Sequence, residues 1–161
     1  IAHLWSYEDL NNRADARARL GKNAEWNNEY VAHVRPLMRR QKIRLMQPRL
    51  DLKVPEGEGH IYEYRFYQTK VGQAGAWIDA ISEAMPAREK YSQNICLWQT
   101  EAENPNEVSH MWAYDDLDQR TQARAGANAD PAWQSFLKKS GSMLEEMENT
   151  FLIPAQFSPL K

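Results

Sequence analysis

The stretch HLWSYEDL at residues 3–10 decides how this sequence is organised, because it returns as HMWAYDDL at residues 110–117. The two stretches share His, Trp, Tyr, Asp and Leu at a constant spacing of 107 residues. The same spacing pairs further residues without a gap: Arg13 with Arg120, Arg17 with Arg124, Trp26 with Trp133, Leu37 with Leu144 and Leu45 with Leu152. Because an internal repeat governs architecture, we interpret the match as a duplicated unit.

Each copy of the matched segment is expected to form a strand, a helix and a second strand. In the opening stretch His, Trp and Tyr alternate with smaller residues, which is the period of a strand. Asp9 and Asp116 then offer N-caps to Arg- and Ala-rich runs that favour helix. In the second copy Pro131 is suited to the first turn of another helix, predicted to reach about Glu148. A short closing strand is expected over residues 150–153.

The segment between the two copies supplies the rest of a second unit. Residues 54–59 are rich in turn-forming residues and predict a linker. Strands are expected over residues 60–68 and 95–101, with an amphipathic helix over residues 73–91 that Pro86 should kink or end early. The order βαββαβ predicts a ferredoxin-like α+β sheet with helices on one face.

The predicted domains follow from this order. Residues 1–53 are expected to be the C-terminal βαβ part of a first repeat, residues 54–59 a linker, and residues 60–161 a complete second repeat with a C-terminal tail. A partial repeat leaves strand edges and a sheet face uncovered. We therefore expect its opening strand, helix and second strand to come from upstream sequence or from another chain.

Several of these segments together resemble the NIPSNAP family. They are the stretches at residues 3–7 and 110–114, the strand YEYRFY at residues 62–67, and the closing LIP and FSPL at residues 152–154 and 157–160. The resemblance covers essentially the whole chain. It implies a dimeric α+β barrel, formed by two repeats in one chain or by paired chains. It also implies partner recruitment, a mitochondrial location for a eukaryotic protein and a cytoplasmic one for a bacterial protein.

Composition narrows the classes of partner. Charged residues make up 26% of the chain, but the formal net charge is only −2. The protein therefore has no overall positive electrostatic field that would attract nucleic acid. No apolar run approaches the roughly 18 residues of a membrane span. The single cysteine, Cys96, lies in an apolar run and is expected to be a buried thiol. Scattered histidines and the absence of nucleotide-binding glycine motifs predict no metal site and no cofactor.

The candidate site follows from strand alternation. Two sets of side chains are expected to share a face: Glu63, Arg65 and Tyr67 on one strand, and His110, Trp112 and Tyr114 on another. We expect this face to line the space between two sheets, with Tyr62, Tyr64 and Phe66 turned to the helices. The first-repeat equivalents are His3, Trp5 and Tyr7.

Two interpretations of this cluster remain open. In one, Arg65 binds a carboxylate or other polar ligand and His110 donates or accepts a proton. In the other, Glu63 pairs with Arg65, His110 bonds a neighbour and Trp112 fills space, because buried charges need partners. No catalytic residue can be assigned. The sequence favours a non-enzymatic binding or scaffold protein that recruits protein partners or forms a homo-oligomer. The alternative is a small-molecule binding protein or cofactor-free enzyme that uses the barrel's inter-sheet pocket.

Overall fold

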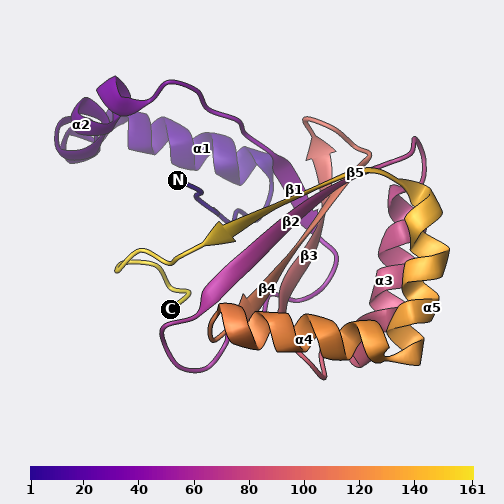
Figure 1. The fold of residues 1–161 in the computed structure, drawn as a ribbon. Coiled ribbons are helices and arrows are strands. Elements are labelled where there is room, and N and C mark those ends of the chain that lie inside the picture. The colour runs from indigo at the N-terminus through magenta and orange to yellow at the C-terminus, as the bar shows by residue number, and fades with distance from the viewer. The chain divides into compact units, whose positions relative to one another are not determined.

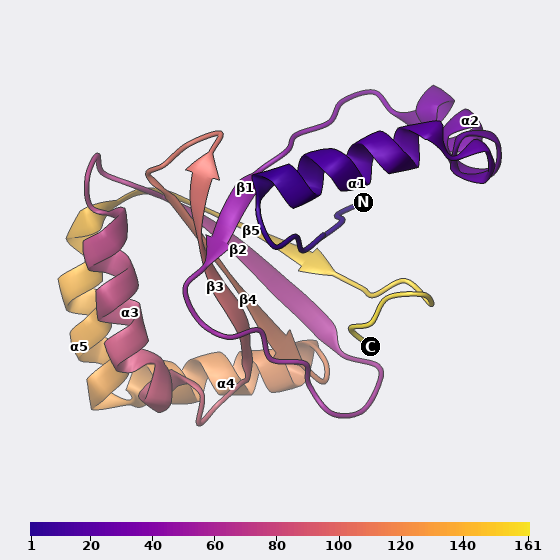
Figure 2. The same ribbon diagram turned by 180° about the vertical axis from the view of Figure 1, so that it is seen from behind.

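An antiparallel sheet of five strands forms the framework of residues 44–161 in the computed structural model, which describes residues 1–161. Its strands are β1 (Leu45–Pro48), β2 (Ile61–Thr69), β3 (Asn94–Ala102), β4 (Glu107–Tyr114) and β5 (Leu144–Leu152). They lie in the order β1-β3-β4-β2-β5, which can be followed in Figures 1 and 2. The last four strands have the split arrangement predicted from the element order, so the ferredoxin-like α+β class is confirmed.

Three helices cover one face of this sheet: α3 (Ala74–Arg88), α4 (Leu117–Ala129) and α5 (Pro131–Ser140) (Figure 1). Helix α4 begins where predicted, because the Asp116 carboxylate accepts a 2.7 Å hydrogen bond from the backbone N–H of Gln119. Pro131 occupies the first turn of α5, also as predicted. Helix α3 ends at Arg88, two residues after Pro86.

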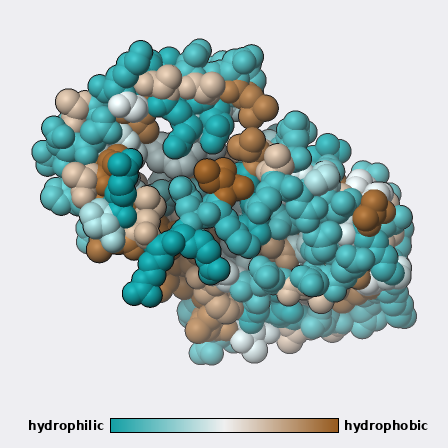
Figure 3. Space-filling view, turned by 90° about the horizontal axis from the view of Figure 1, so that it is seen from above, coloured by the Kyte–Doolittle hydropathy of each residue, from teal (hydrophilic) through white to brown (hydrophobic).

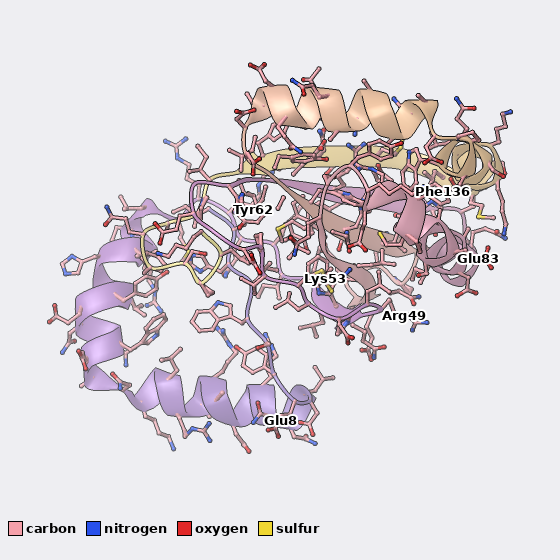
Figure 4. All side chains as sticks on the ribbon, turned by 90° about the horizontal axis from the view of Figure 1, so that it is seen from below. Glu8, Arg49, Lys53, Tyr62, Glu83 and Phe136 are labelled. Carbon is pink, nitrogen blue, oxygen red and sulfur yellow. The ribbon has the colours of Figure 1, made fainter.

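Two apolar clusters lie on opposite faces of the sheet. The helix-side cluster contains Trp77 and Phe136 together with Trp112 and Tyr114 from β4. The open-side cluster contains Tyr62 and Tyr64 together with Met111 and Ala113, on the face away from the three helices. Figure 4 labels one aromatic residue from each cluster, Phe136 on α5 and Tyr62 on β2.

The predicted assignment of faces was therefore wrong. Tyr62 and Tyr64 were expected to face the helices, and the His110, Trp112 and Tyr114 face was expected to be open. The structure reverses this, because α3, α4 and α5 pack on Trp112 and Tyr114. Alternation identifies the residues that share a face, but both faces of these strands carry aromatic side chains. The sequence period gives no means of telling which face the helices cover.

The C-terminal boundary of α5 also differs from the prediction. The helix ends at Ser140, a 3₁₀ turn follows at Gly141–Met143, and β5 occupies residues that were expected to continue the helix. Pairing with β2 along the full length of β5 gives partners to the backbone groups on the side that faces β2. Tertiary pairing thus overrides the helix propensity of the glutamates.

Residues 1–43 form a separate unit that is helical. Helix α1 (Leu10–Lys22) begins at its predicted cap, because Asp9 accepts a 2.7 Å hydrogen bond from the N–H of Asn12. It is followed by a short π-helix at Trp26–Val31, by α2 (Ala32–Val34) and by a 3₁₀ turn at Arg35–Leu37. The strand expected over residues 3–7 is absent, since no neighbouring strand bonds it. The tandem repeat and the domain boundaries stay predictions.

Hydrophilic side chains cover most of the surface that faces the viewer in Figure 3, and apolar residues form scattered patches. None of the helices is long and apolar enough to cross a membrane.

Candidate functional site

The six candidate residues predicted from the second repeat do come together. Strand β2 presents Glu63, Arg65 and Tyr67, and β4 presents His110, Trp112 and Tyr114, on the helix-covered face. Register explains the meeting, because Glu63 lies opposite Trp112 and Arg65 lies opposite His110 in the antiparallel ladder. The cluster lies between the sheet and the helices rather than between two sheets.

Glu63 is the centre of this cluster, and its side chain is fully buried. Arg120 on α4 forms a two-pronged contact with its carboxylate at 2.8 and 3.0 Å. Arg65 donates to Glu63 at 2.7 Å, and the Asn149 amide on β5 donates at 2.9 Å. Arg124, one turn along α4 from Arg120, lies 4.0 Å from the carboxylate. Three guanidinium groups therefore share one carboxylate.

These partners keep Glu63 ionised. Burial by itself would raise the pKa of the carboxyl group. The hydrogen bonds from Arg120 and Asn149 and the charges of Arg65 and Arg120 outweigh burial, and they lower the pKa of Glu63 from 4.5 to about 2. The hydrogen bond to Glu63 also raises the pKa of Arg120. The cluster consequently carries one fixed negative charge and a surplus of positive charge at neutral pH.

His110 lies deeper, between Trp77 and Trp112. The indole N–H of Trp112 donates to His110 Nδ1 at 2.6 Å, so the ring proton of a neutral His110 is on Nε2. That Nε2 atom and Trp77 Nε1 are buried donors without a protein acceptor. Burial is the main reason that the pKa of His110 lies well below 6.5, and the positive charges of nearby arginines lower it further. A ring with one nitrogen occupied and so low a pKa is poorly suited to accept a proton.

Arg88 on α3 adds a buried cation behind the cluster. Its guanidinium donates to Ser92 Oγ at 2.7 Å and to Tyr114 Oη at 3.2 Å, and it lies 4.3 Å from the centroid of the Trp112 ring. No carboxylate lies within ion-pair distance of it. Burial lowers the pKa of Arg88. Tyr114 in turn contacts Glu63 at 3.4 Å and so connects Arg88 to the cluster.

Sequence reasoning missed Arg120, Arg124 and Asn149, which surround Glu63, and Arg88, which lies behind the cluster. A signal for two of them was present, because Arg120 and Arg124 repeat Arg13 and Arg17 at the spacing of 107 and lie four residues apart on one helix face. No pattern in the sequence connects Arg88 or Asn149 to β2. Their positions follow from how α3 and β5 pack against the sheet.

The pairings expected under the second interpretation, in which the charged and aromatic residues only satisfy one another, are present. Glu63 bonds Arg65 and His110 bonds Trp112. The geometry goes further than that interpretation, since each arginine side chain keeps surface exposed: 14% for Arg65, 20% for Arg120 and 38% for Arg124. These partly exposed side chains carry guanidinium donors, which suit a planar or tetrahedral oxyanion.

A pocket of about 450 Å³ has Tyr114 in its lining. Its lining includes Val54, Pro55, His60, Ser92, Tyr114 and Gln119. His60 lies 3.4 Å from Asp115 at its rim. Of the six candidate residues only Tyr114 lines this pocket, together with Ser92, the other hydrogen-bond partner of Arg88.

The first-repeat candidates His3, Trp5 and Tyr7 belong to the unit of residues 1–43, where residues 1–7 form no strand. Trp5 is 63% exposed, whereas its repeat equivalent Trp112 is 1% exposed. The matching tryptophans of the two sequence copies therefore lie in different environments. An equivalent site around these three residues stays a prediction.

The sheet order and the helices on one face define a ferredoxin-like α+β protein. The chain belongs to the NIPSNAP family, whose sequence model matches residues 1–51 and 62–159. It is 30% identical over its whole length to Protein NipSnap homolog 3B of mouse and to Protein NipSnap homolog 3A of human. It spans 66% of the length of each of these relatives.

Solved structures agree with this assignment. A NIPSNAP family protein of unknown function from Agrobacterium tumefaciens is 34% identical, with a TM-score of 0.61 over 63% of this chain and 94% of that protein. A proposed monooxygenase from Lactobacillus acidophilus has a TM-score of 0.62 over 88% of this chain and 66% of that protein. At 15% identity the second likeness concerns the fold alone.

Proposed function

We propose that this NIPSNAP protein is a non-enzymatic binding protein that holds its ligand or partner by an oxyanion group at the arginine cluster, defined as Arg65, Arg120 and Arg124 around Glu63. The observation that carries the proposal is the ratio of charges. The guanidinium groups of three partly exposed arginine side chains surround a single carboxylate, which leaves two positive charges without an acidic partner. A carboxylate or phosphate group supplies the missing charge and matches the geometry of guanidinium donors.

Glu63 has a positioning role in this proposal. By accepting hydrogen bonds from Arg65, Arg120 and Asn149, it fixes the planes of two guanidinium groups before a ligand arrives. Preorganised donors lose less side-chain entropy when they bind. Arg65 is held further by its donation to Tyr67 Oη at 2.6 Å. Arg124 is the least constrained member of the cluster and is free to close on a bound anion.

The partner-recruiting role predicted from the NIPSNAP resemblance fits the same site, since acidic or phosphorylated protein segments carry the same oxyanions. The mitochondrial or cytoplasmic locations expected from the resemblance belong to this proposal too. An enzyme that uses His110 as a base receives less support, because Nδ1 is bonded to Trp112 and burial disfavours the protonated ring.

Thermal unfolding in the presence of anions tests the proposal. Succinate, inorganic phosphate and a phosphoserine peptide are added to the wild-type chain at constant ionic strength, with chloride as reference. We expect at least one of them to raise Tm, because a ligand that binds only the folded state stabilises it. A rise with the peptide alone identifies a protein partner, and a rise with succinate or phosphate identifies a small ligand.

Arg124→Gln and Arg49→Gln form the matched pair of variants. Arg124 belongs to the cluster, whereas Arg49 is exposed and forms no ion pair, so both changes remove one positive charge. We expect Arg124→Gln to lose most of the rise in Tm and Arg49→Gln to keep it. Equal rises in both variants mean a general salt effect and contradict the proposal.

A further inference from the structure

The pocket of about 450 Å³ beside Tyr114 is separate from the arginine cluster, none of whose members lines it. All of its lining residues lie between positions 54 and 119. Part of the lining belongs to the connector before β2, where His60 Nε2 donates a 2.8 Å hydrogen bond to the backbone carbonyl of Glu56. The rest follows α3 or lies at the end of β4 and the start of α4. A pocket of this volume suits a small organic molecule.

The buried part of the lining contains a hydrogen-bond donor that has no acceptor. Ser92 is only 7% exposed, and its Oγ accepts a 2.7 Å hydrogen bond from Arg88. The proton of the Ser92 hydroxyl is therefore left for another acceptor, and the chain supplies none, whereas the Tyr114 hydroxyl donates to Glu63. Arg88 is 4% exposed and has no carboxylate partner. An anionic oxygen at Ser92 would meet both a free donor and an uncompensated positive charge.

The exposed part of the lining has the opposite charge. Glu56 and Asp115 both line the pocket and are both exposed. Neither lies within ion-pair distance of a lysine or an arginine, and Asp115 contacts only His60, at 3.4 Å. Val54 and Pro55 add apolar surface to the lining. A positive charge behind the buried part and two carboxylates at the exposed part favour a ligand with the complementary arrangement of charges.

We infer that this pocket binds a small zwitterion, an aliphatic amino acid whose carboxylate accepts a hydrogen bond from Ser92 and whose ammonium group lies at Glu56 and Asp115. Arg88 has a positioning role, because its donation to Oγ directs the Ser92 proton toward the ligand, and its charge balances the carboxylate. Both charges of the ligand are needed. The carboxylates at the exposed part disfavour a simple acid, and Arg88 disfavours a simple amine.

A chemical-shift titration of the ¹⁵N-labelled chain tests this inference. The probes are glycine, 4-aminobutyrate and 6-aminohexanoate, and the controls with a single charge are hexanoate and hexylamine at the same ionic strength. We expect at least one amino acid to shift the amide signals of Ser92, Gln93 and Asp115 and to bind about tenfold more tightly than either control. Absence of these shifts with all three amino acids, or equally tight binding of hexanoate or hexylamine, overturns the inference.

Removing the charges at the exposed part gives the decisive comparison. In the double variant E56Q/D115N we expect hexanoate to bind about tenfold more tightly than in the wild type, and the amino acids to lose their advantage over it. A gain of binding cannot result from unfolding. The matched variant E58Q/D79N removes the same charges at exposed positions outside the lining and should keep the wild-type preference. Unchanged preference in E56Q/D115N overturns the inference.

Two single variants locate the carboxylate of the ligand. Ser92→Ala removes the free donor and should weaken binding of the amino acid about tenfold, with the remaining amide signals showing that the chain is folded. Arg124→Gln changes the arginine cluster and should leave the binding unchanged. Wild-type affinity in Ser92→Ala, or loss of binding in Arg124→Gln, overturns the inference.

Discussion

Glu63 shows how one buried charge organises a site built from distant segments. Its side chain has no exposed surface, yet it receives hydrogen bonds from β2, α4 and β5. A carboxylate without partners would be costly in such a place, and removing it would leave three guanidinium groups close together without a compensating negative charge. The structure of the cluster thus depends on the ionised form of Glu63.

Replacing Glu63 by Gln should destabilise the protein strongly at neutral pH. The pKa of Glu63 falls from 4.5 to about 2 on folding, which corresponds to about 3 kcal/mol of stabilisation. Because the folded-state pKa is the lower one, this stabilisation is fully present above about pH 4.5 and is lost as pH falls toward 2. Urea unfolding of wild type and Glu63→Gln at pH 7, 4 and 3 should show the difference shrinking at the lower values.

The control for this measurement is Glu58→Gln. Glu58 is exposed and forms no ion pair, so its replacement should change the free energy of unfolding by less than about 0.5 kcal/mol at each pH. A loss for Glu63→Gln that stayed constant from pH 7 to pH 3 would mean that packing, rather than the charge of Glu63, stabilises the cluster.

In the helices, replacing either of two glycines by alanine is expected to have opposite effects on stability. A Cβ at Gly126 in α4 would lie 2.7 Å from two atoms of the Tyr91 ring, whereas a Cβ at Gly75 in α3 meets nothing within 4 Å. Gly75→Ala should stabilise the protein by about 0.5–1 kcal/mol through reduced chain entropy. Gly126→Ala should destabilise it by about 1–3 kcal/mol, since overpacking outweighs the same gain. Chemical denaturation of the two variants compares them, and stabilisation by both would refute the close packing of α4 on Tyr91.

The sequence was sufficient to predict elements with local signals. Asp9, Asp116 and Pro131 each mark a helix start in the structure, because capping and the fixed φ of proline act within one turn. Features that depend on distant residues were not predictable. The change from helix to β5 after Ser140 requires pairing with β2, some eighty residues earlier. Likewise the faces of β2 and β4 were assigned in reverse, because only the packing of the helices distinguishes them.

The same division applies to the candidate site. Alternation along β2 and β4 placed six of its residues on one face, and the strand register brought them together. The arginines of α4 and the amide of Asn149 complete the shell of Glu63 from elements whose approach the strand pattern does not encode. A site that joins a sheet to a helix can therefore be predicted in part from the strands and is completed only by the fold.

At the scale of the whole chain, residues 1–43 and residues 44–161 differ in how much apolar surface they bury. All five strands and every member of both apolar clusters lie within residues 44–161, while no residue of 1–43 is buried. Burial of apolar surface is the main favourable term in folding. We expect a fragment of residues 44–161 to unfold cooperatively, followed by tryptophan fluorescence, because Trp77, Trp98 and Trp112 are buried within it.

The fragment of residues 1–43 should show weak, temperature-dependent helicity by circular dichroism. Its longest helix has 13 residues, and isolated helices of that length are marginal in water. A broad, non-cooperative transition for residues 44–161 would contradict this division and would mean that the sheet needs the preceding segment to fold. A cooperative transition would allow the Glu63 and Arg124 variants to be measured in this shorter fragment, since both residues lie within it.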